Sequence, residues 1–204
     1  RVSNWWTINE PWVVAVEGHE LGLHAPGHQS VKEALDVSHH LLLAHARSMD
    51  VLHSTGSNRV GIVLNQALHM PRSEHPADGA ATYLADGRYN RWFLDPLAGH
   101  GYPVDVVDAL GWDQAAIEQG DLEEIARPMD ALGVNYYTRV LCAAPEVSDV
   151  DRPQPLEVGP TLVEKIAKMS LLFRALPARD PGLPPDHRVE HADLAGLDLH
   201  ALAL

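Results

Sequence analysis

Short strand-type segments alternate with helical segments along the first two thirds of the chain, and this alternation restricts the fold most. Residues 4–8 are aromatic and β-branched and predict a buried strand, residues 60–64 form a continuous apolar run, and residues 132–137 form a third such segment. Helical spacing of apolar residues predicts two long helices, over about 36–53 and 78–97. Shorter helices are expected near 103–110 and 121–129. The order predicts an α/β fold with a parallel sheet, whose functional side chains lie at the carboxyl ends of its strands.

Composition narrows the classes of partner. The 204 residues carry a formal net charge of −13, which disfavours long-range attraction to nucleic acid or to anionic membranes. The chain has a single cysteine, so it forms no internal disulfide, and it contains no apolar run of about 18 residues or more. We therefore expect a cytoplasmic protein whose natural partner is a neutral or polar small molecule, with no nucleic-acid or membrane partner.

A carboxyl group stands at the end of the first predicted strand. Glu10 follows Asn9 and precedes Pro11, which ends the strand because it has no N–H to donate. Three tryptophans lie close in sequence: Trp5, Trp6 and Trp12. Packing among them would desolvate the carboxyl group and keep it protonated near neutral pH, as a general acid requires. For an isolated Asn-Glu-Pro triplet, a surface glutamate that caps a loop is the alternative.

The triplet belongs to a longer pattern. Residues 6–12, Trp-Thr-Ile-Asn-Glu-Pro-Trp, resemble the motif at the end of barrel strand four in glycoside hydrolase family 1, and further segments follow in the family's order and spacing. These are 22–27, 39–47, 61–65, 90–96, 102–103 and 132–139. The chain therefore resembles the central portion of a family 1 β-glucosidase over about residues 2–160.

The resemblance implies a role for each site residue. Glu10 would protonate the glycosidic oxygen and later deprotonate the incoming water, while Asn9 would hold the 2-hydroxyl of the sugar. Tyr137 would orient the nucleophile. Asn135 would line the site, although an amide that only ties down the strand end is an equal alternative. Trp12 is a candidate for the aglycone side, with core packing as the other reading.

The usual nucleophile is missing from the sequence. The family carries it on strand seven in an Ile/Val-Thr-Glu-Asn-Gly motif, and Thr-Glu-Asn occurs nowhere in this chain. Glu190 lies near the expected place, but its neighbours do not match. Residues 1–160 are thus expected to form a partial TIM (β/α)8 barrel, about strands four to six with their helices. Residues 161–204 diverge, with a helix expected over 161–176 and irregular structure beyond.

The sequence leaves two functions open. The first is a retaining β-glucosidase-type hydrolase of β-linked glucosides or related glycosides, present as a fragment that lacks the nucleophile. The alternative is an inactive partial barrel that self-associates through its exposed strand edges and at most binds sugar weakly. No organic cofactor or metal is expected, because His19, Glu20 and His24 miss the zinc-protease spacing by one residue. The histidines expected to pack or to form hydrogen bonds are His39, His40 and His45.

Overall fold

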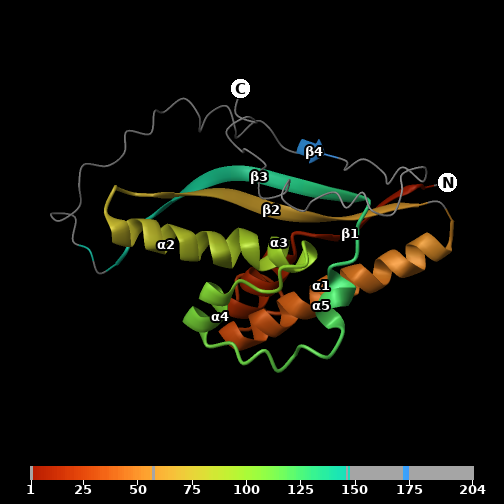
Figure 1. The fold of residues 1–204 in the computed structure, drawn as a ribbon, viewed down its shortest axis with the longest axis horizontal. Helices are drawn as coiled ribbons and strands as arrows, with labels where there is room; N and C mark the ends of the chain where they lie inside the picture. Colours follow the sequence, from red (N-terminus) through yellow and green to blue (C-terminus); the bar gives the residue numbers. More distant parts are fainter. Residues whose placement is uncertain (1, 57, 146, 148–171, 175–204) are drawn as a thin grey trace.

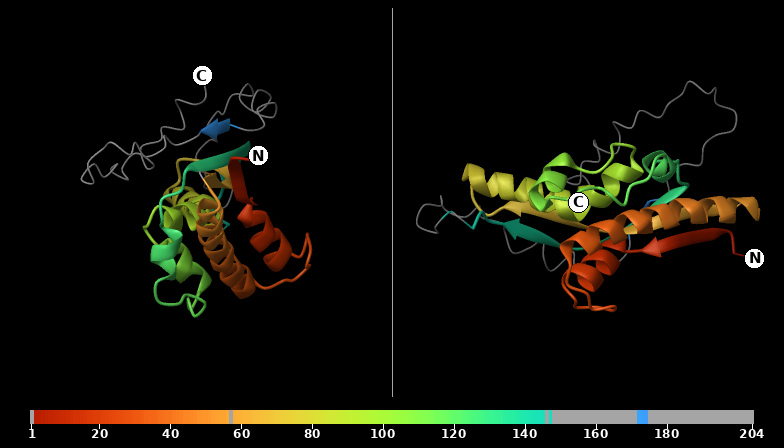
Figure 2. Two further views of the ribbon diagram at one scale, coloured as in Figure 1. Left: turned by 90° about the vertical axis from the view of Figure 1, so that its right-hand side faces the viewer. Right: turned by 90° about the horizontal axis from the view of Figure 1, so that it is seen from below.

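The computed structural model describes residues 2–56, 58–145, 147 and 172–174, and they form a sheet with helices packed on one face (Figures 1 and 2). The strands are β1 (Asn4–Asn9), β2 (Arg59–Pro71), β3 (Ala131–Cys142) and β4 (Leu172–Arg174). The α-helices are α1 (Val31–Ser54), α2 (Pro76–Asp86), α3 (Trp92–Leu97), α4 (Val104–Leu110) and α5 (Asp121–Ile125). Two π-helical segments, η1 (Val13–Glu20) and η2 (Gly87–Arg91), complete the described elements.

The sheet has the order β1-β2-β3-β4, and its first three strands are parallel. Strands that are consecutive in the parallel set are therefore neighbours in space, joined by crossovers that contain the helices. β4 pairs with β3 in the antiparallel direction. Asn65 of β2 lies opposite Asn135 of β3, so the register aligns the polar residues of these two strands. The expected α/β fold with a parallel sheet is confirmed.

The core lies between β2 and the helical layer. Val60 to Leu64 are buried along β2, as expected for a central parallel strand, and Leu35 and Leu42 of α1 pack against the same cluster. The ring systems of Trp92 and Tyr102 lie 4.7 Å apart at their centroids in the centre of this cluster. α1 begins after Ser30, whose hydroxyl caps the helix by accepting a hydrogen bond from the backbone N–H of Glu33.

β1 differs from its expectation. The sequence predicted a buried strand, but Trp5 and Trp6 are 39% and 41% exposed. The physical reason is position: β1 is an edge strand of the sheet, and the helical layer covers one face only (Figure 2). The expectation that the first strand is buried is therefore wrong.

The helix expected over 78–97 is divided into α2, η2 and α3. Within η2 the side chain of Asn90 donates to the carbonyl of Ala67 at 2.7 Å and accepts from its N–H at 3.1 Å. This pair of bonds ties the helical segment to β2, and single π-helical turns inside α-helices occur frequently at functional sites. The helix expected over 161–176 is wrong at Leu172–Arg174, which form β4, and otherwise lies outside the described residues.

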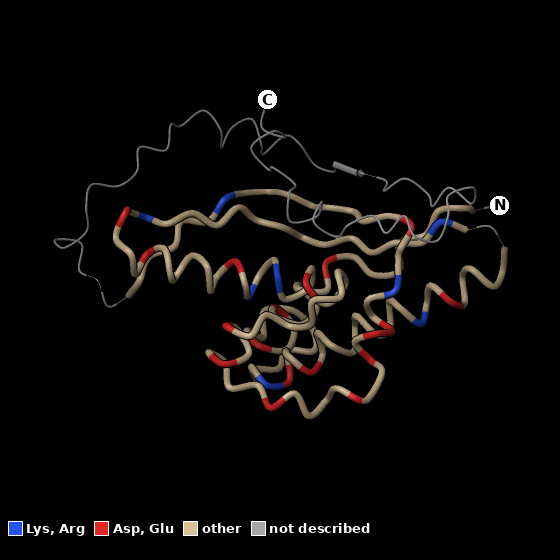
Figure 3. The backbone as a smooth tube through the Cα atoms, in the orientation of Figure 1, with Lys and Arg blue, Asp and Glu red and all other residues tan. Residues whose placement is uncertain are grey.

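Charge is distributed unevenly over the two layers. Strands β1, β2 and β3 contain no aspartate or glutamate, whereas the acidic residues gather in the helical layer and its connections (Figure 3). None of the described helices combines the length and the apolarity needed to span a bilayer.

Candidate active site

Glu10 directly follows β1 and has an unusual backbone conformation. Its φ of 50° is in the left-handed region, which non-glycine residues rarely adopt. The backbone N–H of Glu10 nevertheless donates to the carbonyl of Val63 at 2.8 Å and so extends the contact with β2 beyond the strand. The pairing of β1 with β2 shifts register between Trp6 and Asn9, just before this residue. Backbone strain that the surrounding structure maintains is common at functional sites.

Two residues of β3 hold the carboxylate of Glu10. Asn135 Nδ2 donates to Glu10 Oε1 at 2.7 Å, and the Tyr137 hydroxyl donates to the same oxygen at 2.9 Å. Asn135 and Tyr137 are two residues apart on one strand, so their side chains share a face of the sheet. The bond to Glu10 is the largest cause of a raised pKa for Tyr137, which keeps the phenol protonated as the donor.

Asn9 joins the same group through its side-chain oxygen. Asn135 Nδ2 also donates to Asn9 Oδ1 at 3.1 Å, and these two acceptors fix the orientation of the Asn135 amide. Asn135 is only 6% exposed, and its Oδ1 is buried without a hydrogen-bond partner among the described residues. Asn135 of β3 therefore connects to the end of β1 across the intervening strand.

The sequence-based reasoning overlooked Tyr89. Asn65, at the point where β2 passes the site, donates from Nδ2 to the Tyr89 hydroxyl at 2.9 Å. Burial is the largest cause of a raised pKa for Tyr89, and the negative charges of Glu10 and Glu17 add to it. The sequence placed Asn65 directly after the apolar run 60–64, and this position was a signal that could have identified the residue. No pattern in the sequence singled out Tyr89, which lies in η2.

Trp12 lies against Tyr89, with the ring centroids 4.6 Å apart. It is partly buried and also packs against the hydrophobic core. The structure thus brings Glu10, Asn9, Asn135 and Tyr137 into one hydrogen-bonded group, and it places Trp12 beside that group without a direct bond to it.

Two histidines of α1 are buried and form hydrogen bonds that hold the fold together. His39 is fully buried between Tyr102 and Asp121, with ring nitrogens 3.1 Å from the tyrosine hydroxyl and 3.0 Å from a carboxylate oxygen. His45 is also fully buried and contacts Thr7 of β1 at 2.7 Å. Both agree with the expectation that these histidines pack or form hydrogen bonds. A separate group with the spacing of metal ligands, formed by His19, His28 and Glu33, lies at the connection between η1 and α1.

Comparison with known proteins identifies a matching family and related sequences. The sequence pattern of glycosyl hydrolase family 1 matches residues 1–160. β-Glucosidase A of Thermotoga maritima is 37% identical over 163 residues, which is 76% of this chain and 36% of the relative. The 6-phospho-β-glucosidase of Bacillus subtilis is 38% identical over 141 residues, which is 67% of this chain and 30% of the relative.

Solved structures of β-glucosidases are also similar to this chain. A family 1 β-glucosidase from Exiguobacterium antarcticum superimposes with a TM-score of 0.68 at 38% identity, covering 72% of this chain and 34% of that protein. A psychrophilic β-glucosidase from Micrococcus antarcticus has a TM-score of 0.67 at 33% identity, covering 90% of this chain and 39% of that protein. The chain spans about a third of the length of the curated relatives it matches. The matched region is an α/β part of a TIM-barrel fold, and the chain belongs to glycosyl hydrolase family 1.

Proposed function

We propose that this chain forms the acid/base part of a retaining β-glucosidase site, with β1, β2 and β3 as barrel strands four, five and six. The observation that carries the proposal is the carboxylate of Glu10, held just after the end of β1 by Asn135 and Tyr137 of β3. Sites of (β/α) barrels lie at the carboxyl ends of the strands, where side chains from several strands converge.

Glu10 serves as the general acid and base. Both hydrogen bonds from β3 go to Oε1, so Oε2 is the oxygen that we assign to the proton for the glycosidic oxygen. Because Asn9 Oδ1 accepts from Asn135, its N–H₂ group is oriented to donate to the 2-hydroxyl of the sugar, an interaction that strengthens in the transition state. Trp12, beside Tyr89, provides an aromatic surface on the aglycone side.

A retaining mechanism needs a second carboxyl group, about 5–5.5 Å from the first, that attacks the anomeric carbon. The Thr-Glu-Asn motif expected for that nucleophile does not occur in the sequence. By the resemblance, Tyr137 would orient the nucleophile, and its hydroxyl donates to Glu10. We assign to Tyr137 a position between the two carboxyl groups, so that it would contact both in a complete site.

The proposal is tested by hydrolysis of an aryl β-glucoside by the purified chain, its Glu10→Gln variant and a Glu123→Gln control. Glu123 is an exposed carboxylate of α5, so its loss leaves the site unchanged. Removal of a general acid typically costs about 10² to 10⁴-fold in rate. Turnover that falls by this amount in Glu10→Gln and is unchanged in Glu123→Gln supports the proposal. Equal turnover in all three proteins contradicts it.

An inactive partial barrel that self-associates is the second candidate function, and the exposed edge strand favours it. β1 ends the described sheet on one side and presents Trp5 and Trp6 to solvent. Unpaired strand edges and exposed apolar surface promote association. Absence of turnover in a folded chain, together with concentration-dependent oligomers in sedimentation velocity, would select this candidate over the hydrolase. Comparison of glucoside with 6-phosphoglucoside substrates distinguishes the two classes named among the relatives.

A further inference from the structure

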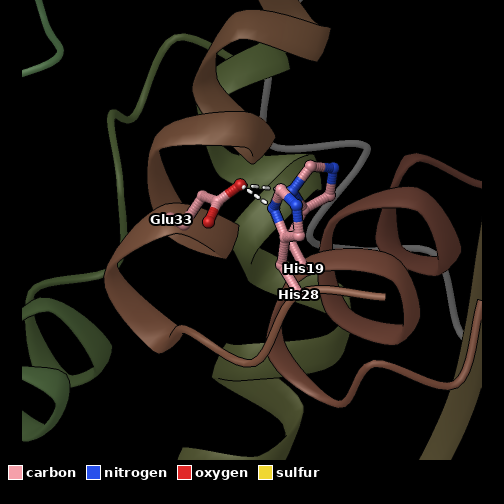
Figure 4. Close-up of side chains that lie close together, drawn as sticks. All are labelled: His19, His28 and Glu33. Carbon is pink, nitrogen blue, oxygen red and sulfur yellow. Dashed lines mark hydrogen bonds and ion pairs between the residues drawn. The ribbon is translucent and has the colours of Figure 1, made fainter. Parts of the chain in front are cut away.

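Three potential metal ligands converge at the connection that follows the Glu10 segment. His19 lies in the last turn of η1, His28 in the loop after it, and Glu33 in the first turn of α1 (Figure 4). The Nδ1 atoms of His19 and His28 are 2.8 Å and 2.6 Å from the same oxygen, Glu33 Oε1. One ligand atom from each residue lies within 4.8 Å of the others.

The backbone of the loop holds both histidines in place. The N–H of His28 donates to the carbonyl of Gly18 at 3.0 Å, and the N–H of Ser30 donates to the carbonyl of His19 at 2.7 Å. The two imidazole rings are nearly perpendicular, at 87°, with centroids 5.4 Å apart. The loop therefore presents two rings in fixed and different orientations toward one carboxylate.

Glu33 is not used for the helix-capping role that its position suggests. Ser30 and Glu33 have the spacing of a capping box, in which the glutamate side chain accepts from the N–H of the N-cap residue. Here that N–H donates to the carbonyl of His19, and the Glu33 carboxylate contacts His28 and His19. The carboxylate therefore lies between two imidazoles and has no capping role.

We propose that His19, His28 and Glu33 bind one divalent transition-metal ion, with Zn²⁺ as the fitting class. Two imidazole nitrogens and one carboxylate oxygen are ligands that zinc accepts in tetrahedral sites with a water in the fourth position. Calcium and magnesium prefer oxygen ligands, so they fit this set poorly. The site differs from our sequence expectation of no metal, because that expectation considered His24, whereas the fold brings His28 and Glu33 to His19.

The geometry requires a small adjustment and a change of protonation. Zinc–nitrogen bonds of about 2.0–2.1 Å in a tetrahedron place ligand atoms about 3.3 Å apart, so the two contacts to Glu33 must open by less than about 1 Å. Each Nδ1 must offer its lone pair, so the rings bind as Nε2–H tautomers. In a neutral ring the proton moves from Nδ1 to Nε2 by exchange with solvent. A ring that carries protons on both nitrogens releases its Nδ1 proton to solvent.

The test uses the purified chain, stripped of metal with a chelator and titrated with Zn²⁺ in a calorimeter. We expect one ion per chain at the site, with Mg²⁺ giving no binding. Loss of an outer-shell partner costs about 10–100-fold in metal affinity, so His28→Gln and Glu33→Gln, which each remove a direct ligand, should cost at least about 100-fold. His28 is half exposed, so its replacement is compatible with folding, which circular dichroism verifies.

His24→Gln is the matched control. His24 lies in the same loop, pairs with Glu17 at 2.9 Å and lies outside the cluster, so this variant should bind Zn²⁺ with unchanged affinity. Zn²⁺ should also raise the Tm of the wild-type chain and of His24→Gln, but not that of Glu33→Gln. Equal Zn²⁺ affinity in all four proteins would assign the binding to other histidines and overturn the proposal. Failure of the folded wild type to bind one ion would overturn it as well.

Discussion

His45 should make the stability of this chain depend on pH in a defined window. The side chain is fully buried, and its Nδ1 lies 2.7 Å from the Thr7 hydroxyl. That hydroxyl donates its own proton to the carbonyl of Gly61 at 3.2 Å, so the histidine must donate from Nδ1. Its Nε2 is buried and has no hydrogen-bond partner among the described residues. Protonation would therefore place a charged N–H where no acceptor is available.

The size of the effect follows from the depressed pKa. Burial lowers the pKa of His45 from 6.5 to about 4. Above pH 6.5 neither the folded nor the unfolded chain is protonated at this residue, and its contribution to stability is complete. As the pH falls below 6.5 the unfolded chain binds a proton that the folded chain does not bind until about pH 4. The full difference is worth about 3 kcal/mol, most of which is lost by about pH 4.5.

The assay is urea unfolding of the wild type and of a His45→Gln variant between pH 7 and about pH 4.5. Glutamine keeps an N–H for the Thr7 contact and does not titrate. All other groups titrate in both proteins, so the difference between the two stability curves isolates His45. We expect the wild type to lose about 2–3 kcal/mol more than the variant over this range. Parallel curves would refute the reasoning, because they would mean that His45 is protonated equally in both states.

Three further predictions concern packing. Gly61→Ala should destabilise the chain by at least about 1–3 kcal/mol in urea unfolding, because a Cβ there would lie 2.1 Å from the carbonyl oxygen of Ala131. Unchanged stability would contradict this close approach. A Cβ added at Gly79 in α2 would meet no atom within 4 Å, so Gly79→Ala should stabilise the folded chain by about 0.5–1 kcal/mol. A loss of stability would contradict this expectation. Leu42→Ala, at a fully buried position of α1, should cost about 2–5 kcal/mol, and a cost below 1 kcal/mol would place this helix outside the core.

Local sequence patterns predicted the secondary structure well for the central strand and for the long helix that packs against it. The apolar run at 60–64 is the buried part of β2, and the helical spacing over 36–53 lies within α1. The predictions failed where burial or helix continuity depends on parts of the chain that are distant in sequence. Trp5 and Trp6 look like core residues in the sequence, yet β1 is at the edge of the sheet and exposes them. The α-helix expected over 78–97 is interrupted by the π-helical segment η2, in which Asn90 bonds to Ala67, 23 residues away.

The sequence by itself determined the order of strands and helices and placed Asn9 and Glu10 at a strand end, because periodicity and strand-breaking residues act over a few positions. It also supported the family through ordered motifs. Only the tertiary structure decided that Asn135 and Tyr137 meet Glu10 from 125 and 127 residues away and that Tyr89 lies nearby. Such contacts depend on strand register and loop path, which no local pattern encodes.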